Sequence, residues 1–212
     1  MHVVIVTGGT FQMSPLIQKA LDSADLIIAA DSGANTITSL GIYPQIVVGD
    51  FDSLNPKIKK ILQRKESKFI SFSIVKDETD TELAIDYAIQ HGATSITLLG
   101  GLQGDRFDHV IGNIFLLSQI KIPIVGLNSN QKIWIEKGPK KVIIDGNKYD
   151  LLSLIPLKSA VTNITTDGLY YSLKNENLEF GRPRGVSNVL TSKKAIVKFK
   201  KGLLLFIHTT TL

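Results

Sequence analysis

Two aspartates two residues apart, Asp50 and Asp52, follow an apolar run that we expect to form a buried strand. The run covers residues 46–48, and Gly49 separates it from the first aspartate. Side chains alternate along an extended strand, so the two carboxylates should point the same way. Adjacent ionised carboxylates repel each other, and a divalent cation such as Mg²⁺, which prefers hard oxygen ligands, relieves that repulsion. The other interpretation is a solvated turn at the end of the strand, to which Ser53 contributes.

A third carboxylate stands at the start of an expected helix. Thr79 is placed to cap this helix, and Glu82 stands three residues later, as in a capping box. Asp80 would then lie in the first helical turn, where the helix dipole favours its ionised form. Either Asp80 only stabilises the helix, by about 0.3–1 kcal/mol, or it joins the two aspartates after Gly49 as a metal ligand.

Arg106 and Asp108 begin another expected helix, after a run rich in glycine. The guanidinium group of Arg106 can bind two phosphate oxygens at once. Asp108 could cap the helix, pair with Arg106 or orient a nucleophile. The chain has neither a P-loop pattern nor G-x-G-x-x-G. A nucleotide bound here would therefore depend on a metal ion, on arginine and on the backbone of glycines.

The elements that position these residues alternate between strand and helix in the first part of the chain. Strands are expected at residues 3–6, 26–30, 46–48, 69–74, 96–99 and 122–127, and helices from Ser14 and over residues 55–64, 81–91 and 108–120. This alternation, with mostly apolar strands, predicts an α/β domain with a parallel sheet wrapped by helices. The carboxyl ends of such strands meet at one edge, so the acids and glycines that follow them should gather there.

The second part of the chain has a different pattern, without an expected helix. Short strands are expected at residues 132–136, 141–144, 149–155, 164–165, 195–200 and 203–208, separated by turn dipeptides such as Asp145-Gly146. This pattern predicts an antiparallel β-sandwich or a small barrel, of which we expect the sandwich. Trp134 lies in the first of these strands and is expected in the core or at an interface. We therefore divide the chain into an α/β domain over residues 1–128 and a β-sandwich over residues 129–212.

Composition restricts the class of protein. The 212 residues include no cysteine, so disulfides and thiolate metal sites are excluded. The apolar runs are far shorter than the roughly 18 residues of a membrane span, and we expect a cytoplasmic protein without a membrane partner. The net charge of +5 is uneven, because residues 1–129 have 10 Lys and Arg against 13 Asp and Glu, whereas residues 130–212 have 14 against 6. The candidate residues lie in the acidic part, which disfavours nucleic-acid binding.

Short motifs occur in a fixed order along nearly the whole chain. They are Asp31-Ser32-Gly33-Ala34, Gly49-Asp50-Phe51-Asp52-Ser53, Lys76-Asp77-Glu78-Thr79-Asp80, Arg106-Phe107-Asp108-His109, Gly168-Leu169-Tyr170-Tyr171-Ser172-Leu173 and Gly185-Val186-Ser187-Asn188. This ordered set resembles the motifs of the thiamine pyrophosphokinase family. Asp105 is a departure, because the family usually has glycine at this position.

The resemblance implies an enzyme that transfers the diphosphate group of ATP to the hydroxyl group of thiamine and gives thiamine diphosphate and AMP. It implies Mg²⁺ as the cofactor, an α/β domain that binds ATP, and a β-sandwich that supplies much of the thiamine pocket. It also implies a homodimer whose active sites lie between subunits. Two other interpretations of the acidic edge stay open. One is a different Mg²⁺-dependent phosphohydrolase, and the other is a nucleotide-binding regulatory module without catalysis.

The resemblance also assigns roles to individual residues. The metal ligands would be Asp50, Asp52 and Asp80, which together with Asp108 form the catalytic group. The residues that would contact ATP are Asp31, Ser32, Gly33, Lys76, Thr79, Gln103, Arg106 and Asp108. The residues that would contact thiamine are Tyr171, Ser187 and Asn188. The sequence does not decide whether Asp80 or Asp108 accepts the proton of the thiamine hydroxyl group.

Overall fold

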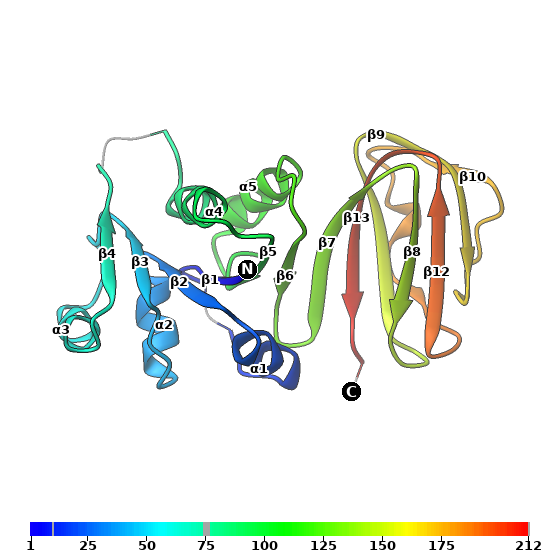
Figure 1. The fold of residues 1–212 in the computed structure, drawn as a ribbon. Coiled ribbons are helices and arrows are strands. Elements are labelled where there is room, and N and C mark those ends of the chain that lie inside the picture. The colour runs from blue at the N-terminus through cyan, green and yellow to red at the C-terminus, as the bar shows by residue number, and fades with distance from the viewer. Residues whose placement is uncertain (10, 74–76, 212) are drawn as a thin grey trace. The chain divides into compact units, whose positions relative to one another are not determined.

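A computed structural model describes residues 1–9, 11–73 and 77–211 of the chain. It divides into two compact units, Met1–Ser129 and Asn130–Leu212 (Figure 1). The first unit combines a parallel sheet with helices, and the second is built from antiparallel strands, so the fold class expected from the sequence is confirmed. Within the described residues, the helices are too short or too polar to cross a membrane.

Parallel strands form the sheet of the first unit, in the spatial order β4-β3-β2-β1-β5-β6. Their bounds are β1 His2–Val6, β2 Leu26–Ala30, β3 Ile46–Gly49, β4 Lys68–Ser71, β5 Ser95–Leu99 and β6 Ile124–Leu127. Neighbouring strands run parallel, so they end at the same edge of the sheet. Because β2 and β5 lie on opposite sides of β1, the strand order reverses there. Ligands of open parallel sheets bind outside the carboxyl ends at such a reversal.

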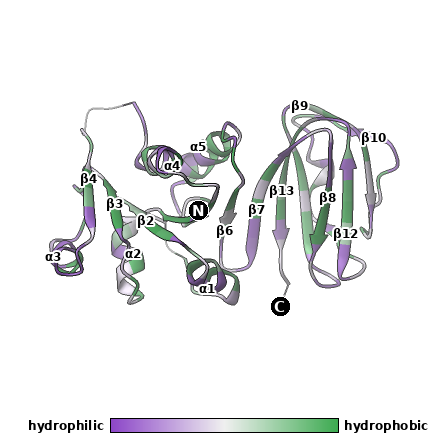
Figure 2. Cartoon of the chain, viewed as in Figure 1, coloured by the Kyte–Doolittle hydropathy of each residue, from purple (hydrophilic) through white to green (hydrophobic). Residues whose placement is uncertain are grey.

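Helices cover both faces of this sheet, as the strand–helix alternation predicts. Their bounds are α1 Pro15–Asp22, α2 Gly33–Ser39, α3 Pro56–Arg64, α4 Asp80–Gln90 and α5 Phe107–Leu117. The first three pack on one face, where Val4 and Val6 of β1 share an apolar core with Ile17, Ile37 and Leu62 of the helices. Figure 1 shows α4 and α5 on the opposite face. Strands β2 and β3 are hydrophobic over most of their length (Figure 2), which fits burial on both faces.

Local signals explain most of these helices, but not α2. Ser14, Asn55 and Thr79 are the N-caps of α1, α3 and α4, and each accepts a hydrogen bond from a backbone N–H of the first turn. The sequence does not predict α2, because glycine, serine and threonine are poor helix formers. Its Ala34 and Ile37 are fully buried, so packing against the sheet maintains this helix.

Strand β4 is the edge of the sheet and is shorter than the sequence predicts. Lys68 and Ser71 at its ends are exposed, in agreement with the more exposed strand that its alternation indicates. It ends at Ser71, whereas the predicted strand extends to residue 74, which lies outside the described residues.

Antiparallel strands form the second unit. Their bounds are β7 Gln131–Lys137, β8 Lys140–Asp145, β9 Leu151–Asp167, β10 Glu176–Leu178, β11 Asn188–Val189, β12 Lys194–Phe199 and β13 Lys201–Thr209, with a short 3₁₀ helix η1 Pro183–Gly185. Strand β9 corrects the sequence prediction of strands at residues 149–155 and 164–165. It begins at Leu151, after the first two residues of the first expected strand, and continues through the second expected strand as one strand of 17 residues. Its first part pairs with β13 and its last part with β12, so β9 joins both sheets of the sandwich.

The interior of the second unit is mainly apolar. Trp134 of β7 is half-buried against this core, and its ring stacks on that of Phe206 in β13 with the ring centres 5.0 Å apart. The tryptophan therefore packs on the core, which is one of the two positions expected from the sequence. Asp150 is a polar exception, because its carboxylate is fully buried and lies 3.0 Å from the ring of His208.

Candidate functional site

The acidic residues of the first unit follow neighbouring strands of the sheet. Asp31 comes directly after β2 and Asp50 directly after β3, and these strands pair so that Ala30 lies opposite Val48. The backbone N–H of Asp31 donates to the carbonyl oxygen of Val48 at 2.8 Å. The sheet therefore brings both aspartates to the same part of its carboxyl edge.

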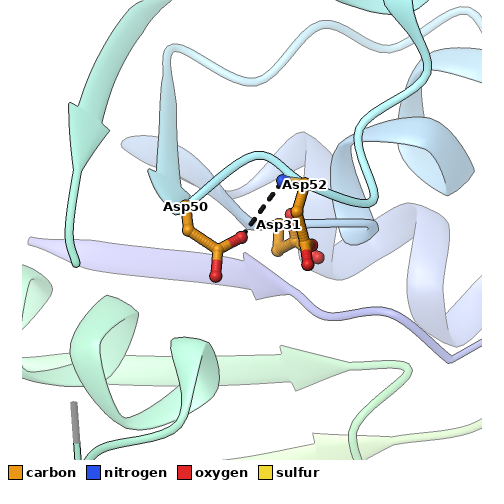
Figure 3. Close-up of side chains that lie close together, drawn as sticks. All are labelled: Asp31, Asp50 and Asp52. Carbon is orange, nitrogen blue, oxygen red and sulfur yellow. Dashed lines mark hydrogen bonds between the residues drawn. The ribbon is translucent and has the colours of Figure 1, made fainter. Parts of the chain in front are cut away.

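Asp31, Asp50 and Asp52 form a cluster of carboxylates, with their side chains directed to a common space (Figure 3). One carboxylate oxygen of each lies within 4.8 Å of one from each of the others. Asp31 and Asp50 are half-buried, and Asp52 is exposed. The backbone N–H of Asp52 donates to Oδ1 of Asp50 at 3.1 Å, which closes a tight turn between the two.

The two carboxylate oxygens of Asp31 have different surroundings. Oδ2 accepts a hydrogen bond from the hydroxyl group of Ser53. Oδ1 is buried and has no hydrogen-bond partner among the residues that the structure describes. A buried carboxylate oxygen without a partner is costly, and a divalent cation would satisfy it. The donor set, made of hard carboxylate oxygens, fits Mg²⁺.

The charges in this cluster repel one another. The pKa of Asp52 is raised above its ordinary value, first by the negative charge of Asp50, then by the partial loss of hydrating water, by a hydrogen bond with Asp50 and by the charge of Asp31. A cation bound between these carboxylates would remove the repulsion and favour their ionised forms. The repulsion between the carboxylates and the buried Oδ1 of Asp31 therefore both favour a positive charge between these side chains.

Asp80 lies beside the cluster. The sequence predicts Asp80 as the third metal ligand, whereas the three carboxylates that lie together belong to Asp31, Asp50 and Asp52. Asp80 is the first residue of α4, which Thr79 caps by accepting a first-turn N–H at 3.2 Å, as the sequence predicts. Gly49 has a φ of 145°, and a methyl group added to it would lie 3.3 Å from Oδ1 of Asp80 and 3.2 Å from Cβ of Asp31. The space beside Gly49 thus borders both aspartates. Lys76, which the sequence places near them, lies outside the described residues.

The glycine-rich segments after β1 and β5 approach each other closely. A methyl group added at Gly9 would lie 2.0 Å from the carbonyl oxygen of Gly100. Ser32 and Gly33, at the start of α2, pack against the end of β1, and a methyl group at Gly33 would lie 2.1 Å from the carbonyl oxygen of Val6. Backbone without side chains therefore borders the reversal of the sheet, at the edge that carries the acidic cluster.

Arg106 and Asp108 are paired with each other at the start of α5. Nε of Arg106 donates to Oδ1 of Asp108 at 3.0 Å, and Nη2 donates to Oδ2 at 2.7 Å. This hydrogen bonding lowers the pKa of Asp108 to about 2. The sequence leaves three roles open for Asp108, and the structure shows one of them, the pairing with Arg106. Gln103 lies in the preceding loop, whose positive φ of 111° falls on Gly104 and not on Asp105.

Tyr171, Ser187 and Asn188 lie together in the second unit. The side-chain amide of Asn188 accepts the N–H of Tyr171 at 3.0 Å and donates to the carbonyl oxygen of Tyr171 at 2.8 Å. Asn188 is buried, whereas Tyr171 and Ser187 are exposed, and the φ of Ser187 is 57°. Asn188 therefore fixes the backbone of the tyrosine, while Tyr171 and Ser187 are accessible to a ligand.

Sequence reasoning missed two features of these units. It assigns Asp31 to nucleotide contacts alone, although Asp31 meets Asp50 and Asp52, and the available signal is its position directly after a strand. It also gives no sign of a cavity of about 510 Å³ in the second unit, lined by Thr166, Asp167, Gly168, Ser172 and Lys194 among others. Residues 166–168 end β9 and turn, and nothing in their types indicates a hollow.

Two family models match the chain one after the other. The model described as the catalytic domain of thiamin pyrophosphokinase matches residues 17–134, and the model described as the vitamin B1 binding domain of thiamin pyrophosphokinase matches residues 134–204. Among curated relatives, the thiamine pyrophosphokinase of Bacillus subtilis (strain 168) is 30% identical over 211 residues, which cover 97% of both chains.

Solved structures match the chain over its whole length. The crystal structure of thiamine pyrophosphokinase from Bacillus subtilis has a TM-score of 0.88 and 29% identity, with complete coverage of both chains (100%). The crystal structure of thiamin pyrophosphokinase from Geobacillus thermodenitrificans has a TM-score of 0.82 and 27% identity, and covers 100% of this chain and 98% of its own.

Proposed function

The chain belongs to the thiamin pyrophosphokinase family, and we infer that it transfers the diphosphate group of ATP to the hydroxyl group of thiamine, with thiamine diphosphate and AMP as products. The observation that carries this inference is the succession of a catalytic model and a vitamin B1 binding model along the chain. Neither a different Mg²⁺-dependent phosphohydrolase nor a regulatory nucleotide-binding module has comparable support.

We assign Mg²⁺ to the carboxylates of Asp31, Asp50 and Asp52, with Asp80 beside them as the further ligand that the sequence predicts. The mutual distance of 4.8 Å or less and the buried Oδ1 of Asp31 support this assignment. When bound, Mg²⁺ neutralises charge on the phosphate oxygens of ATP and opens the β-phosphorus to attack. Asp31 then has a metal ligand's role in addition to the nucleotide contact expected from the sequence.

Groups at the same edge of the sheet would bind the phosphates of ATP. Gly9 and Gly33 let the segments that carry them pack tightly at this edge, because a side chain at either position would meet a backbone carbonyl oxygen, of Gly100 or of Val6. The side chain of Arg106 is 72% exposed, so its guanidinium group can exchange the carboxylate of Asp108 for phosphate oxygens. The residues that we propose to contact ATP are Asp31, Ser32, Gly33, Lys76, Thr79, Gln103, Arg106 and Asp108.

A carboxylate of the chain would accept the proton that thiamine loses when its hydroxyl group attacks the β-phosphorus. Asp108 is a weak base while Arg106 holds its pKa at about 2. While this pair persists, Asp80 is the better candidate of the two that the sequence leaves open. Where phosphate takes Arg106 away from Asp108, the carboxylate of Asp108 is released and can accept the proton. The remaining contribution of the chain is positioning, since holding the hydroxyl group in line with the β-phosphorus lowers the entropic cost of the reaction.

The second unit is proposed to bind thiamine, with residues 1–128 as the catalytic domain and residues 129–212 as the thiamine-binding domain. The exposed ring of Tyr171 can stack on a ring of thiamine, and the hydroxyl group of Ser187 can form a hydrogen bond with it. Asn188 would act mainly by fixing Tyr171, because its amide is already bonded to the backbone of that residue.

We further propose a homodimer with active sites between subunits. Phe107, Ile111 and Phe115 recur every four residues along α5, and they are 68%, 39% and 59% exposed. Burial of such an apolar helix face against a second copy would be favourable. Sedimentation of the purified protein tests this, and a monomer at concentrations that support activity would contradict it. The proposed location is the cytoplasm, where ATP is available.

An assay of the purified chain with ATP, Mg²⁺ and thiamine tests the reaction. We expect AMP and thiamine diphosphate in equal amounts, and no AMP without thiamine. Release of phosphate or diphosphate at the same rate without thiamine would favour a phosphohydrolase, and ATP binding without turnover would favour a regulatory module. Asp52→Asn should abolish the reaction in a folded protein. Asp86→Asn is the control, because Asp86 is an exposed aspartate of α4 outside the cluster.

A further inference from the structure

Phe51 separates the two aspartates of the turn and has an unfavourable backbone conformation. Its φ is 66°, in the left-handed region that bulky residues rarely adopt. The hydrogen bond from the N–H of Asp52 to Oδ1 of Asp50 closes the turn around it. Because the two carboxylates also repel each other, this part of the chain would relax to another conformation unless contacts elsewhere held it.

Two contacts outside the turn hold the side chain of Phe51. Its ring packs edge-on against that of Phe69 in β4, with the ring centres 5.4 Å apart and the planes at 81°. Nζ of Lys59 in α3 lies 5.3 Å from the centre of the Phe51 ring, which is a cation–π distance. Both phenylalanines also pack against the apolar core of the first unit. The turn is thereby attached to a strand and a helix that carry none of the three carboxylates.

We propose that Phe51 is a positioning residue, whose ring, held by Phe69 and Lys59, keeps the backbone in the conformation that directs Asp50 and Asp52 toward Asp31. Figure 3 shows the arrangement that results, with the three carboxylates facing one space. A site assembled before the cation arrives avoids the cost of ordering its ligands on binding. The inference rests on the proposed function, because a divalent cation is what these carboxylates would bind.

Binding of Mn²⁺, a paramagnetic substitute for Mg²⁺, tests the proposal without turnover. Electron paramagnetic resonance of free Mn²⁺ gives the dissociation constant for the chain of residues 1–212 in the absence of nucleotide. Asparagine adopts a positive φ readily, whereas the β-branched valine resists it. We expect Phe51→Val to weaken Mn²⁺ binding about tenfold or more, as changes to residues that orient metal ligands do, and Phe51→Asn to weaken it only about threefold.

The order of these two variants separates positioning from core filling. A residue that only filled space would give the opposite order, because valine restores more apolar contact than asparagine does. Tighter Mn²⁺ binding by Phe51→Val than by Phe51→Asn would therefore overturn the proposal. If Phe51→Val does not fold, Phe69→Leu replaces it. That variant keeps Phe51 but removes its ring partner, and an unchanged Mn²⁺ dissociation constant there would equally refute the positioning role.

Two further variants complete the design. Ile42→Ala removes another half-buried side chain from the same apolar core, outside the turn, and should leave the Mn²⁺ dissociation constant within about twofold of wild type. A loss of Mn²⁺ binding in Ile42→Ala as large as in Phe51→Val would contradict a specific role for Phe51.

Asp52→Asn tests the metal site itself. If Asp52→Asn binds Mn²⁺ as tightly as wild type, both the metal assignment and the positioning proposal are wrong. If Asp52→Asn loses Mn²⁺ binding while the Phe51 variants keep it unchanged, only the positioning proposal is wrong.

Discussion

The carboxylate of Asp150 makes a dense set of hydrogen bonds inside the second unit, and its removal should be strongly destabilising. Asp150 is fully buried, with 0% of its surface exposed. Its Oδ2 accepts the N–H of Asn147 at 2.8 Å and lies 3.0 Å from Nε2 of His208, and its Oδ1 accepts the N–H of Thr211 at 3.1 Å. These bonds tie the segment before β9 to the end of β13. We therefore choose Asp150→Ala as the perturbation.

The expected magnitude follows from the groups that lose their partner. Alanine leaves two partly buried backbone N–H groups and the buried ring nitrogen of His208 without the carboxylate. An unsatisfied buried group costs about 1–3 kcal/mol. Water that enters the vacated space recovers part of this. We expect the free energy of unfolding to fall by about 3–5 kcal/mol, which is the summed cost of the three groups less the part that water recovers. That is a large share of the roughly 5–15 kcal/mol of a typical protein.

Urea unfolding at pH 7, followed by circular dichroism, measures this effect. Asp145→Ala is the matched control, because Asp145 is an acid of the same unit whose side chain is 79% exposed and 3.5 Å from Nζ of Lys194. An exposed ion pair of that kind contributes at most about 1 kcal/mol. If Asp150→Ala lowers the free energy of unfolding by less than about 1 kcal/mol, or by no more than Asp145→Ala, the role assigned to Asp150 is refuted.

Acid should reduce the difference between wild type and Asp150→Ala. Burial by itself raises the pKa of Asp150, but the hydrogen bonds from Asn147, Thr211 and His208 outweigh it, so the pKa lies below its ordinary value of 3.8. A carboxyl group with a lowered folded-state pKa stabilises the fold fully above its unfolded pKa and loses this contribution as the pH falls through the folded value. Unfolding measured from pH 7 to below pH 3.8 should show the two free energies converging, and a constant difference would contradict this.

The remaining expectations concern catalysis. Gly49→Ala should reduce product formation ~10²-fold or more in a folded protein, because φ at this position is 145° and the added methyl group would enter the space beside Asp80. A variant that keeps more than a tenth of the wild-type activity would contradict this packing of the site. Asp80→Asn should lower kcat ~10²-fold or more and Asp108→Asn clearly less, and the reverse order in steady-state kinetics would exclude Asp80 as the proton acceptor. Ser187→Ala should raise the KM for thiamine about 2- to 10-fold through loss of one hydrogen bond, with the KM for ATP nearly unchanged. Equal changes in the two KM values would count against thiamine binding by the second unit.

Local signals in the sequence are sufficient for the fold class and most helix starts, but not for features that depend on distant contacts. Helix caps such as Thr79 act within one turn, so they can be recognised without knowledge of the fold. Strand β9 shows the opposite case. Leu152 and Leu154 mark its buried face in the first part, but Lys158 and Ser159 are exposed where the pairing of β9 with β13 changes register. The alternation breaks there, and two strands are predicted where one exists.

The acidic turn shows why a correct expectation can rest on an incomplete reason. The sequence predicts that Asp50 and Asp52 face the same way because side chains alternate along an extended strand, but the φ of 66° at Phe51 means that this segment is not extended. The carboxylates converge because Asp50 accepts the N–H of Asp52, which is the turn that the sequence offers as the alternative to a metal site. The turn at residues 50–52 therefore also forms part of the carboxylate cluster, so the two interpretations do not exclude each other. Asp31 joins them only because β2 pairs with β3, a long-range arrangement that no local spacing encodes. Phe51 carries no chemical group for catalysis, and its ring packs against Phe69 and lies near Nζ of Lys59, which are contacts outside the turn.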